Sequence, residues 1–168
     1  QIHKARHVVV DKLKPIFRAY YKEISLEREA VSFSYYSQLN ETPFADLLHD
    51  NFARDLVLQR TDAGIHKDEL EFALGSNKMK KFGSQGQQKS FIISLKLAQF
   101  ELIKQSKGYN PLLLIDDIFD KLDNDRSRQL VDLIASGRFG QVFLTDTDEA
   151  HISETLKGRE DLFEVIKV

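Results

Sequence analysis

Apolar residues recur at helical spacing over the first 24 residues and then alternate with polar residues from 30 to 37. The first pattern predicts an amphipathic helix, with a kink or a junction of two helices at Pro15. The second pattern predicts a strand with one buried face. Thr42 followed by Pro43 is typical of a helix start. We expect that helix to turn its apolar residues inward, namely Phe44, Leu48, Phe52 and Leu56.

The spacing of apolar positions changes again along the second half of the chain. Residues 69–82 alternate around a turn at Gly75, which predicts a β-hairpin. The strongest helical stripe covers residues 86–104, before a Gly-Tyr-Asn-Pro break. The segments that follow are an apolar strand at 112–115, a helix at 125–136, a strand at 142–145, a short helix at 149–157 and a strand at 162–168. This alternation of helices and strands predicts an α/β fold.

Length and composition narrow the class of protein. The 168 residues suffice for one domain, or for one core with an appendage. A net charge of −2 gives no overall attraction to nucleic acid, so any DNA contact has to come from a local patch. The lack of cysteine excludes disulfides and thiolate metal sites and is consistent with a cytoplasmic protein. No apolar run reaches transmembrane length, and because the chain starts at Gln1 inside a helical pattern we expect a piece of a longer protein.

Two adjacent carboxylates, Asp116 and Asp117, follow the apolar strand at 112–115. In parallel α/β sheets ligands bind just outside the carboxyl ends of the strands, and two acids placed there are costly unless they hold a cation or act on a proton. We expect Asp116 to hold Mg²⁺ through water, and Asp117 to orient the attacking water in phosphoryl transfer. A helix cap or a solvated turn is the alternative interpretation of the same two residues.

A small polar loop, GSQGQQK, opens the long helix about thirty residues earlier. Ser84 is suited to cap that helix, which is the simpler interpretation of the loop. A helix N-terminus with free N–H groups, a hydroxyl and a glycine also suits a phosphate. Together with the two aspartates the loop indicates nucleotide chemistry, although no G-x-x-x-x-G-K-[ST] phosphate loop occurs in the chain.

The order of these segments resembles the RecF family of DNA-repair ATPases, which are of the ABC/SMC type. The resemblance rests on SQGQQK, the helix, LLLIDDIFDKLD and the buried strand ending in Thr145, and on TDAGIHKDEL, where Ile65 and Lys67 replace the family's proline and arginine. It implies a signature motif that binds the γ-phosphate of ATP held by the partner subunit, formed by Ser84, Gln85, Gly86 and Gln87. It also implies Asp116 as the magnesium ligand, Asp117 as the catalytic acid, and Asp120 and Asp123 in a D-loop at the dimer interface.

For the whole protein, the resemblance implies the C-terminal part of an ABC-type ATPase head, with a helical arm and lobe segment over residues 1–60 and the ATPase core over 61–168. It implies a cytoplasmic protein of DNA repair, recombination, replication and the SOS response that uses ATP and Mg²⁺ to form a homodimer on single-stranded or gapped DNA, away from membranes. Recombination-mediator proteins are the implied partners in recombinase loading and replication restart. Because the family's P-loop lies in its N-terminal part, we expect this fragment not to hydrolyse ATP alone and to expose an unpaired sheet edge.

Two other functions are compatible with these residues. The acidic strand end is also a candidate metal-dependent nuclease site, if Asp68 or Asp146 converges on Asp116 and Asp117. The remaining alternative is a module that binds DNA or a partner protein without ATP, through lysines near the hairpin and the signature helix, namely Lys78, Lys80, Lys81 and Lys89. Binding by such a module falls steeply with salt and does not respond to ATP.

Overall fold

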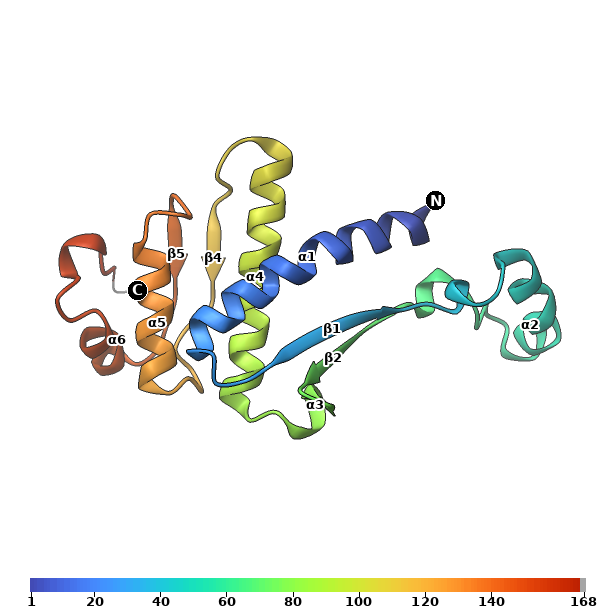
Figure 1. The fold of residues 1–168 in the computed structure, drawn as a ribbon, viewed down its shortest axis with the longest axis horizontal. Helices are drawn as coiled ribbons and strands as arrows, with labels where there is room; N and C mark the ends of the chain where they lie inside the picture. Colours follow the sequence, from blue (N-terminus) through green and yellow to red (C-terminus); the bar gives the residue numbers. More distant parts are fainter. Residues whose placement is uncertain (167–168) are drawn as a thin grey trace.

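The computed structural model describes residues 1–166 and arranges them as a core with a small lobe held away from it on a two-stranded ribbon (Figure 1). The first half of the chain contains α1 (Ile2–Ser25), β1 (Val31–Tyr36), a 3₁₀ turn (Gln38–Asn40), α2 (Phe44–Leu58), a 3₁₀ turn (Ile65–Lys67), β2 (Glu69–Leu74), β3 (Asn77–Lys78) and α3 (Met79–Phe82). The second half contains α4 (Gln85–Lys107), β4 (Leu113–Ile115), α5 (Asn124–Ala135), β5 (Val142–Leu144), α6 (Glu149–Thr155) and a 3₁₀ turn (Glu160–Leu162). This is the expected α/β architecture.

The core forms where the second half of α1 crosses α4 and contacts α5 (Figure 1). Phe17 of α1 is fully buried, and its ring centroid lies 4.5 Å from that of Phe91 on α4 and 5.2 Å from that of Phe33 on β1. Aromatic rings at these separations add to the stabilisation that comes from burying their apolar area. Residues on both sides of position 60 therefore contribute to one core, and the division of the chain there stays a prediction.

Two small sheets flank this core. Strands β1, β2 and β3 form an antiparallel sheet, whereas β4 and β5 pair in parallel, with Leu113 opposite Val142 and Ile115 opposite Leu144. Leu113 and Ile115 point into the core, but Leu114 on the opposite face is 64% exposed. Parallel sheets normally bury both faces. Within residues 1–166 each of these two strands has a single neighbour, as expected for an incomplete ATPase sheet.

Helix α1 differs in part from expectation. It is continuous from Ile2 to Ser25 through Pro15, so of the two predicted alternatives, a kink or a junction of two helices, the junction is wrong. Its predicted apolar stripe is buried only from the middle onward, and Ile2 and Val9 are half exposed. The first half leaves the core and runs toward the lobe, where Arg6 donates to the carbonyl of Ile65 at 2.6 Å. Solvent thus replaces protein around these first turns.

No helix among residues 1–166 combines the length and the apolarity needed to cross a membrane.

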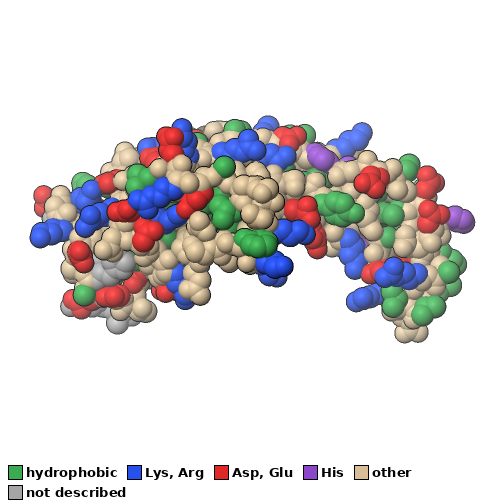
Figure 2. Space-filling model, turned by 60° about the horizontal axis from the view of Figure 1, so that its bottom comes forward, with side chains coloured by type: hydrophobic (Ala, Val, Ile, Leu, Met, Phe, Trp, Pro, Cys, Tyr) green, Lys and Arg blue, Asp and Glu red, His purple; other side chains and the backbone are tan. Residues whose placement is uncertain are grey.

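The expectation that the apolar side of α2 faces inward is wrong. Phe44, Phe52 and Leu56 are 51%, 63% and 64% exposed, and Leu47 is instead the buried residue of the helix. The physical reason is position: α2 lies in the lobe, so no core faces it (Figure 1). Figure 2 shows hydrophobic side chains gathered on the surface at that end of the molecule. The helix also begins at Phe44 with Pro43 as its N-cap, so Thr42 does not cap it.

Two strand predictions also need correction. After the turn at Gly75 only Asn77–Lys78 pairs with β2, and the chain then forms the short helix α3. No strand forms over residues 162–166, and residues 167 and 168, the end of that predicted strand, lie outside the described residues. Val165 and Ile166 are 60% and 73% exposed. Apolar residues dominate this segment, but within residues 1–166 no strand pairs with it.

Candidate functional site

The two predicted acids stand at the carboxyl end of β4, where the next strand of the sheet holds them. Thr145, directly after β5, donates its hydroxyl hydrogen to the carboxylate of Asp116 and accepts the backbone N–H of Asp117 at 3.0 Å. The backbone of Thr145 continues the ladder, donating to the carbonyl of Ile115 at 3.1 Å and accepting from Ile118 at 3.0 Å. Asp116 is exposed and Asp117 is half-buried. The parallel pairing of β4 and β5 therefore determines where both carboxylates lie.

Asp117 adopts a left-handed backbone conformation, with φ of 54°. Its carbonyl accepts a hydrogen bond of 2.7 Å from the ammonium group of Lys89 on α4. Lys89 is half-buried, so it anchors the turn after β4 and is not part of an exposed lysine patch with its neighbours in sequence. The contact fastens the signature helix to the turn that carries the predicted catalytic acid.

The polar loop before α4 forms a complete capping box. The hydroxyl of Ser84 accepts from the backbone N–H of Gln87 at 3.2 Å, and the side chain of Gln87 accepts from the backbone N–H of Ser84 at 2.7 Å. Ser84 and Gln85 are exposed. The N–H groups of Gln85 and Gly86, the first two of the helix, have no acceptor within the helix, as at any helix start. The helix-cap interpretation of the loop is thus confirmed, and the end of the helix stays open to an anion.

Gly86 is where the signature loop touches the predicted D-loop. A Cβ atom at this position would lie 2.8 Å from the carbonyl oxygen of Lys121, closer than real side chains approach backbone atoms. Lys121 itself adopts a left-handed conformation, with φ of 63°. Only glycine permits this approach of the two backbones. The segments predicted as signature motif and D-loop are therefore in direct contact within one chain.

We expect Gly86→Ala to lower the free energy of unfolding by about 1–3 kcal/mol, because the added methyl overlaps a backbone atom that cannot rotate away. The sign of this change is informative, because replacing glycine by alanine inside an unobstructed helix stabilises a protein by about 1 kcal/mol. Urea unfolding followed by circular dichroism measures the change. Gln85→Ala, at the exposed neighbouring position, is the control and should stay within about 0.5 kcal/mol of the unmodified protein. A stabilised Gly86→Ala protein would contradict the close contact.

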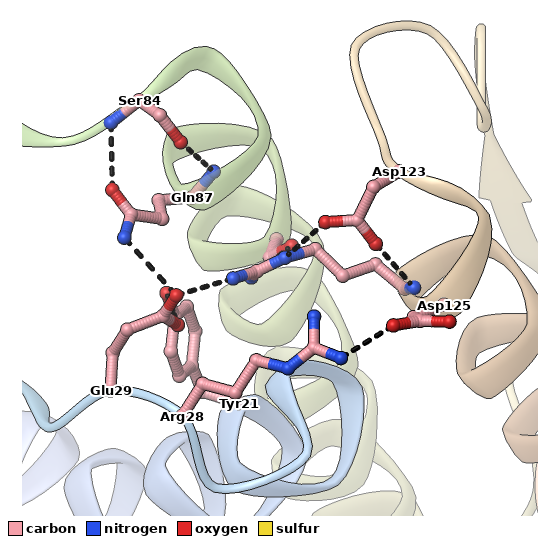
Figure 3. Close-up of polar contacts among 9 residues, drawn as sticks. Tyr21, Arg28, Glu29, Ser84, Gln87, Asp123 and Asp125 are labelled. Atoms are coloured by element: carbon pink, nitrogen blue, oxygen red, sulfur yellow. Dashed lines mark hydrogen bonds and ion pairs between the residues drawn. The ribbon is translucent and has the colours of Figure 1, made fainter.

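A carboxylate from the loop after α1 joins the same two segments (Figure 3). One oxygen of Glu29 accepts from the side-chain amide of Gln87 at 3.1 Å and from the guanidinium of Arg126 at 2.5 Å. The other oxygen accepts from the hydroxyl of Tyr21 at 3.0 Å. Arg126, on the first turn of α5, also donates to the carboxylate of Asp123 at 3.3 Å. Glu29 thus lies between the signature loop and the end of the D-loop.

Burial and neighbouring charges shift the pKa values of Tyr21 and Arg126 in this cluster. Burial raises the pKa of Tyr21 to about 12, so its hydroxyl remains a donor at neutral pH. Burial by itself lowers the pKa of Arg126, but the contact with Tyr21 and the charge of Glu29 outweigh burial and raise it above its ordinary value. The side chain of Arg126 is 5% exposed. A buried arginine of this kind holds its carboxylate partner by charge as well as by hydrogen bonds.

The remaining predicted residues have separate surroundings. Asp123 caps α5 by accepting from the backbone N–H of Arg126 at 2.9 Å, and Asp120 forms an exposed ion pair of 3.0 Å with Lys121. Asp68 does not join Asp116, because it lies directly before β2 of the other sheet and pairs with Arg6 at 2.5 Å.

Asp146 does approach the site, but one of its oxygens accepts the backbone N–H of Phe119 at 2.8 Å and the other that of Asp148 at 3.0 Å. Among residues 1–166, no three His, Cys, Asp or Glu side chains are grouped to hold a metal. In the part of the chain that the structure describes, neither Asp68 nor Asp146 thus joins Asp116 and Asp117 in a three-residue metal cluster.

Sequence reasoning missed two members of the site. Arg126 carries a weak local signal, because it stands three residues after the capping Asp123, where a side chain can turn back to the cap. Glu29 carries none, since it lies in a short connection far from the signature loop in sequence. Thr145 can bond to Asp116 and Asp117 because it stands one residue after β5, which runs parallel to β4.

Sequence comparison finds relatives of this chain among known proteins, although no protein-family model matches it. The chain is 41% identical over 167 residues to the DNA replication and repair protein RecF of Flavobacterium johnsoniae, covering 99% of this chain and 46% of that protein. It is 44% identical over 155 residues to the protein of the same name from Parabacteroides distasonis, covering 92% and 42%. The chain thus spans less than half the length of these relatives.

Solved structures give the same fold. A structure described as the recombination mediator protein RecF with ATPrS in the RecFOR pathway superposes with a TM-score of 0.68 at 24% identity, covering 88% of this chain and 42% of that one. A chain from work on ATP-driven dimerisation and DNA-stimulated activation of SMC ATPases superposes with a TM-score of 0.55 at 13% identity, covering 89% and 76%. The fold of this chain is therefore similar to the fold of these two structures.

Proposed function

Because the chain belongs to the RecF family of DNA replication and repair proteins, related to ABC/SMC ATPases, and corresponds to its C-terminal part, we propose that it supplies half of a composite ATP site. The observation that carries the proposal is the contact of the signature loop with the turn after β4. Lys89 binds the carbonyl of Asp117, and Gly86 lies against Lys121. A loop suited to phosphate and a strand end suited to a cation thus stand side by side on one surface.

Each residue has a role that its surroundings support. Mg²⁺ prefers one or two carboxylates together with water and phosphate oxygens, and the exposed Asp116, with one oxygen on Thr145, fits that need without a third acid. Asp117 accepts a proton from the attacking water, or orients that water. Ser84 and Gly86 face the γ-phosphate of a nucleotide bound by a second subunit. The phosphate cradle comes from the N-terminal part of the full-length protein.

In the full-length protein, ATP with Mg²⁺ joins two heads on single-stranded or gapped DNA, and hydrolysis by this ATPase releases them. Recombination-mediator proteins are its partners, and recombinase loading and replication restart in the cytoplasm are the outcome. Support comes from the relatives' description as DNA replication and repair proteins and from a solved RecF of the RecFOR pathway that was determined with ATP. Asp120 and Asp123, beside the signature loop, form part of the contact between the two heads.

The test is whether ATP joins two copies of the full-length protein. Sedimentation velocity with Mg²⁺ should show a monomer without nucleotide and with ADP, and a dimer with a slowly hydrolysed ATP analogue. The control is DNA binding at increasing salt with and without that analogue. If DNA binding falls with salt but is the same with and without the analogue, and no dimer appears, the chain is part of an ATP-independent binding module instead.

A further inference from the structure

Glu29 links the two nucleotide-facing segments of the chain, and we propose that it is a positioning residue that makes the signature loop and the D-loop respond to ATP as one unit. The inference rests on the proposed function, because it concerns how that composite site closes. It assigns a role to a residue outside the signature loop, the strand-end pair Asp116 and Asp117, and the D-loop. The residue lies in the connection between α1 and β1.

The link is a continuous chain of hydrogen bonds (Figure 3). Ser84 and Gln87 hold each other through the capping box, and the free amide end of Gln87 donates to Glu29 at 3.1 Å. Glu29 accepts from Arg126 at 2.5 Å, and Arg126 donates to Asp123 at 3.3 Å. Ser84 at the signature loop and the carboxylate of Asp123 at the end of the D-loop are thereby joined by a series of hydrogen bonds, in which only the capping box uses backbone N–H groups.

Burial strengthens the hydrogen bonds in the middle of this series. The side chains of Arg126 and Glu29 are 5% and 17% exposed, so water competes little with their bond. Arg126 also donates to the hydroxyl of Ser90 at 3.1 Å inside α4. The guanidinium is therefore held from both helices, and a shift of one helix end displaces the other.

The charge of Glu29 is needed as well as its length. One of its oxygens accepts two donors, from Gln87 and Arg126, and the other accepts Tyr21. A glutamine at this position can turn its one oxygen to Gln87 and Arg126 and its NH₂ group to the hydroxyl of Tyr21, which can accept, but it removes the negative charge that Arg126 faces. Glu29→Gln therefore keeps the shape of the side chain and weakens the link by removing its charge.

A matched control lies one residue away. Arg28, from the same loop, pairs with Asp125 on the same helix at 2.5 Å, but the two side chains are 45% and 53% exposed. The hydrogen bond of this pair joins the loop after α1 to the start of α5 and does not involve Ser84 or Gln87 (Figure 3). Asp125→Asn therefore makes the same chemical change, carboxylate to amide, without touching the chain from Ser84 to Asp123.

The experiment uses the full-length protein and measures the ATP-analogue concentration that gives half-maximal dimerisation, by light scattering. For Glu29→Gln we expect this concentration to rise about tenfold, the usual size of a coupling between sites. Binding of a fluorescent ATP analogue to the monomer should not change, because the phosphate cradle is not altered. For Asp125→Asn we expect dimerisation within about twofold of the unmodified protein, as for an exposed ion pair.

The outcomes separate the inference from the proposed function. A shift below twofold for Glu29→Gln, or equal shifts for Glu29→Gln and Asp125→Asn, overturns the inference. If the unmodified protein does not dimerise with ATP, or if Ser84→Arg dimerises normally, the proposed function fails instead. Should Glu29→Gln not fold, Glu29→Asp is judged by the same thresholds, because it keeps the charge but cannot reach both Gln87 and Arg126.

Discussion

In the full-length protein, Asp117→Asn slows ATP hydrolysis by about 10²- to 10⁴-fold and leaves the ATP-bound dimer trapped. The amide neither accepts a proton from the attacking water nor polarises it as a carboxylate does. Binding of the cation is preserved, because Asp116 and its bond from Thr145 are not altered. Phosphate release in a single turnover measures the rate, and light scattering after dilution measures how long the dimer persists.

The matched control for this prediction is Asp132→Asn. Asp132 lies on the second half of α5 and makes an ion pair with Arg159. The same chemical change thus occurs away from the nucleotide-facing surface. Its hydrolysis rate should equal that of the unmodified protein within about twofold. A normal rate for Asp117→Asn would show that a different group activates the water, and it would leave Asp117 with a structural role in the turn.

Ser84→Arg abolishes ATP-dependent dimerisation while the monomer still binds ATP. The long side chain fills the space in front of the exposed N–H groups of Gln85 and Gly86, so the phosphate of a partner's nucleotide cannot approach them. Sedimentation velocity with a slowly hydrolysed ATP analogue measures the loss. The change also removes the cap of α4, and a second replacement is needed to separate the two effects.

Ser84→Asp provides that separation. Aspartate caps helices as well as serine does, so α4 should stay intact, but its negative charge repels a phosphate. We expect Ser84→Asp to lose the dimer like Ser84→Arg, and Ser84→Thr, which keeps both the hydroxyl and the cap, to retain it. If Ser84→Asp dimerises normally, the loop is only a helix cap, which is the simpler of the two interpretations offered by the sequence.

The parts of the fold that the sequence predicted well are those whose pattern repeats over several turns or is wholly apolar. Helix α4 and strands β4 and β5 lie where expected to within a few residues. For α2 the helix was predicted but its buried side was wrong. Periodicity shows that a helix has an apolar side, but whether a core lies opposite that side depends on where the chain carries the helix. The ribbon of β1 and β2 carries α2 away from the core.

The candidate site shows the same division between local and distant information. The capping residue Ser84, the strand-end acids and the glycine are recognisable because helix ends and strand ends have local residue preferences. The pair of Glu29 and Arg126 is not, because its members are 97 positions apart and nothing in the sequence between them specifies the meeting. That contact exists because α1 packs against α5 as well as against α4.

The left-handed backbone at Asp117 limits which acid the protein can use there. In that conformation most side chains cost about 1–2 kcal/mol, whereas Asp and Asn are tolerated best after glycine because their short polar groups bond locally. A glutamate would reach one methylene farther toward a nucleotide, but it lacks the short polar group that bonds locally in this conformation. The backbone of the turn, held by Lys89 and Thr145, therefore favours the shorter acid at this position.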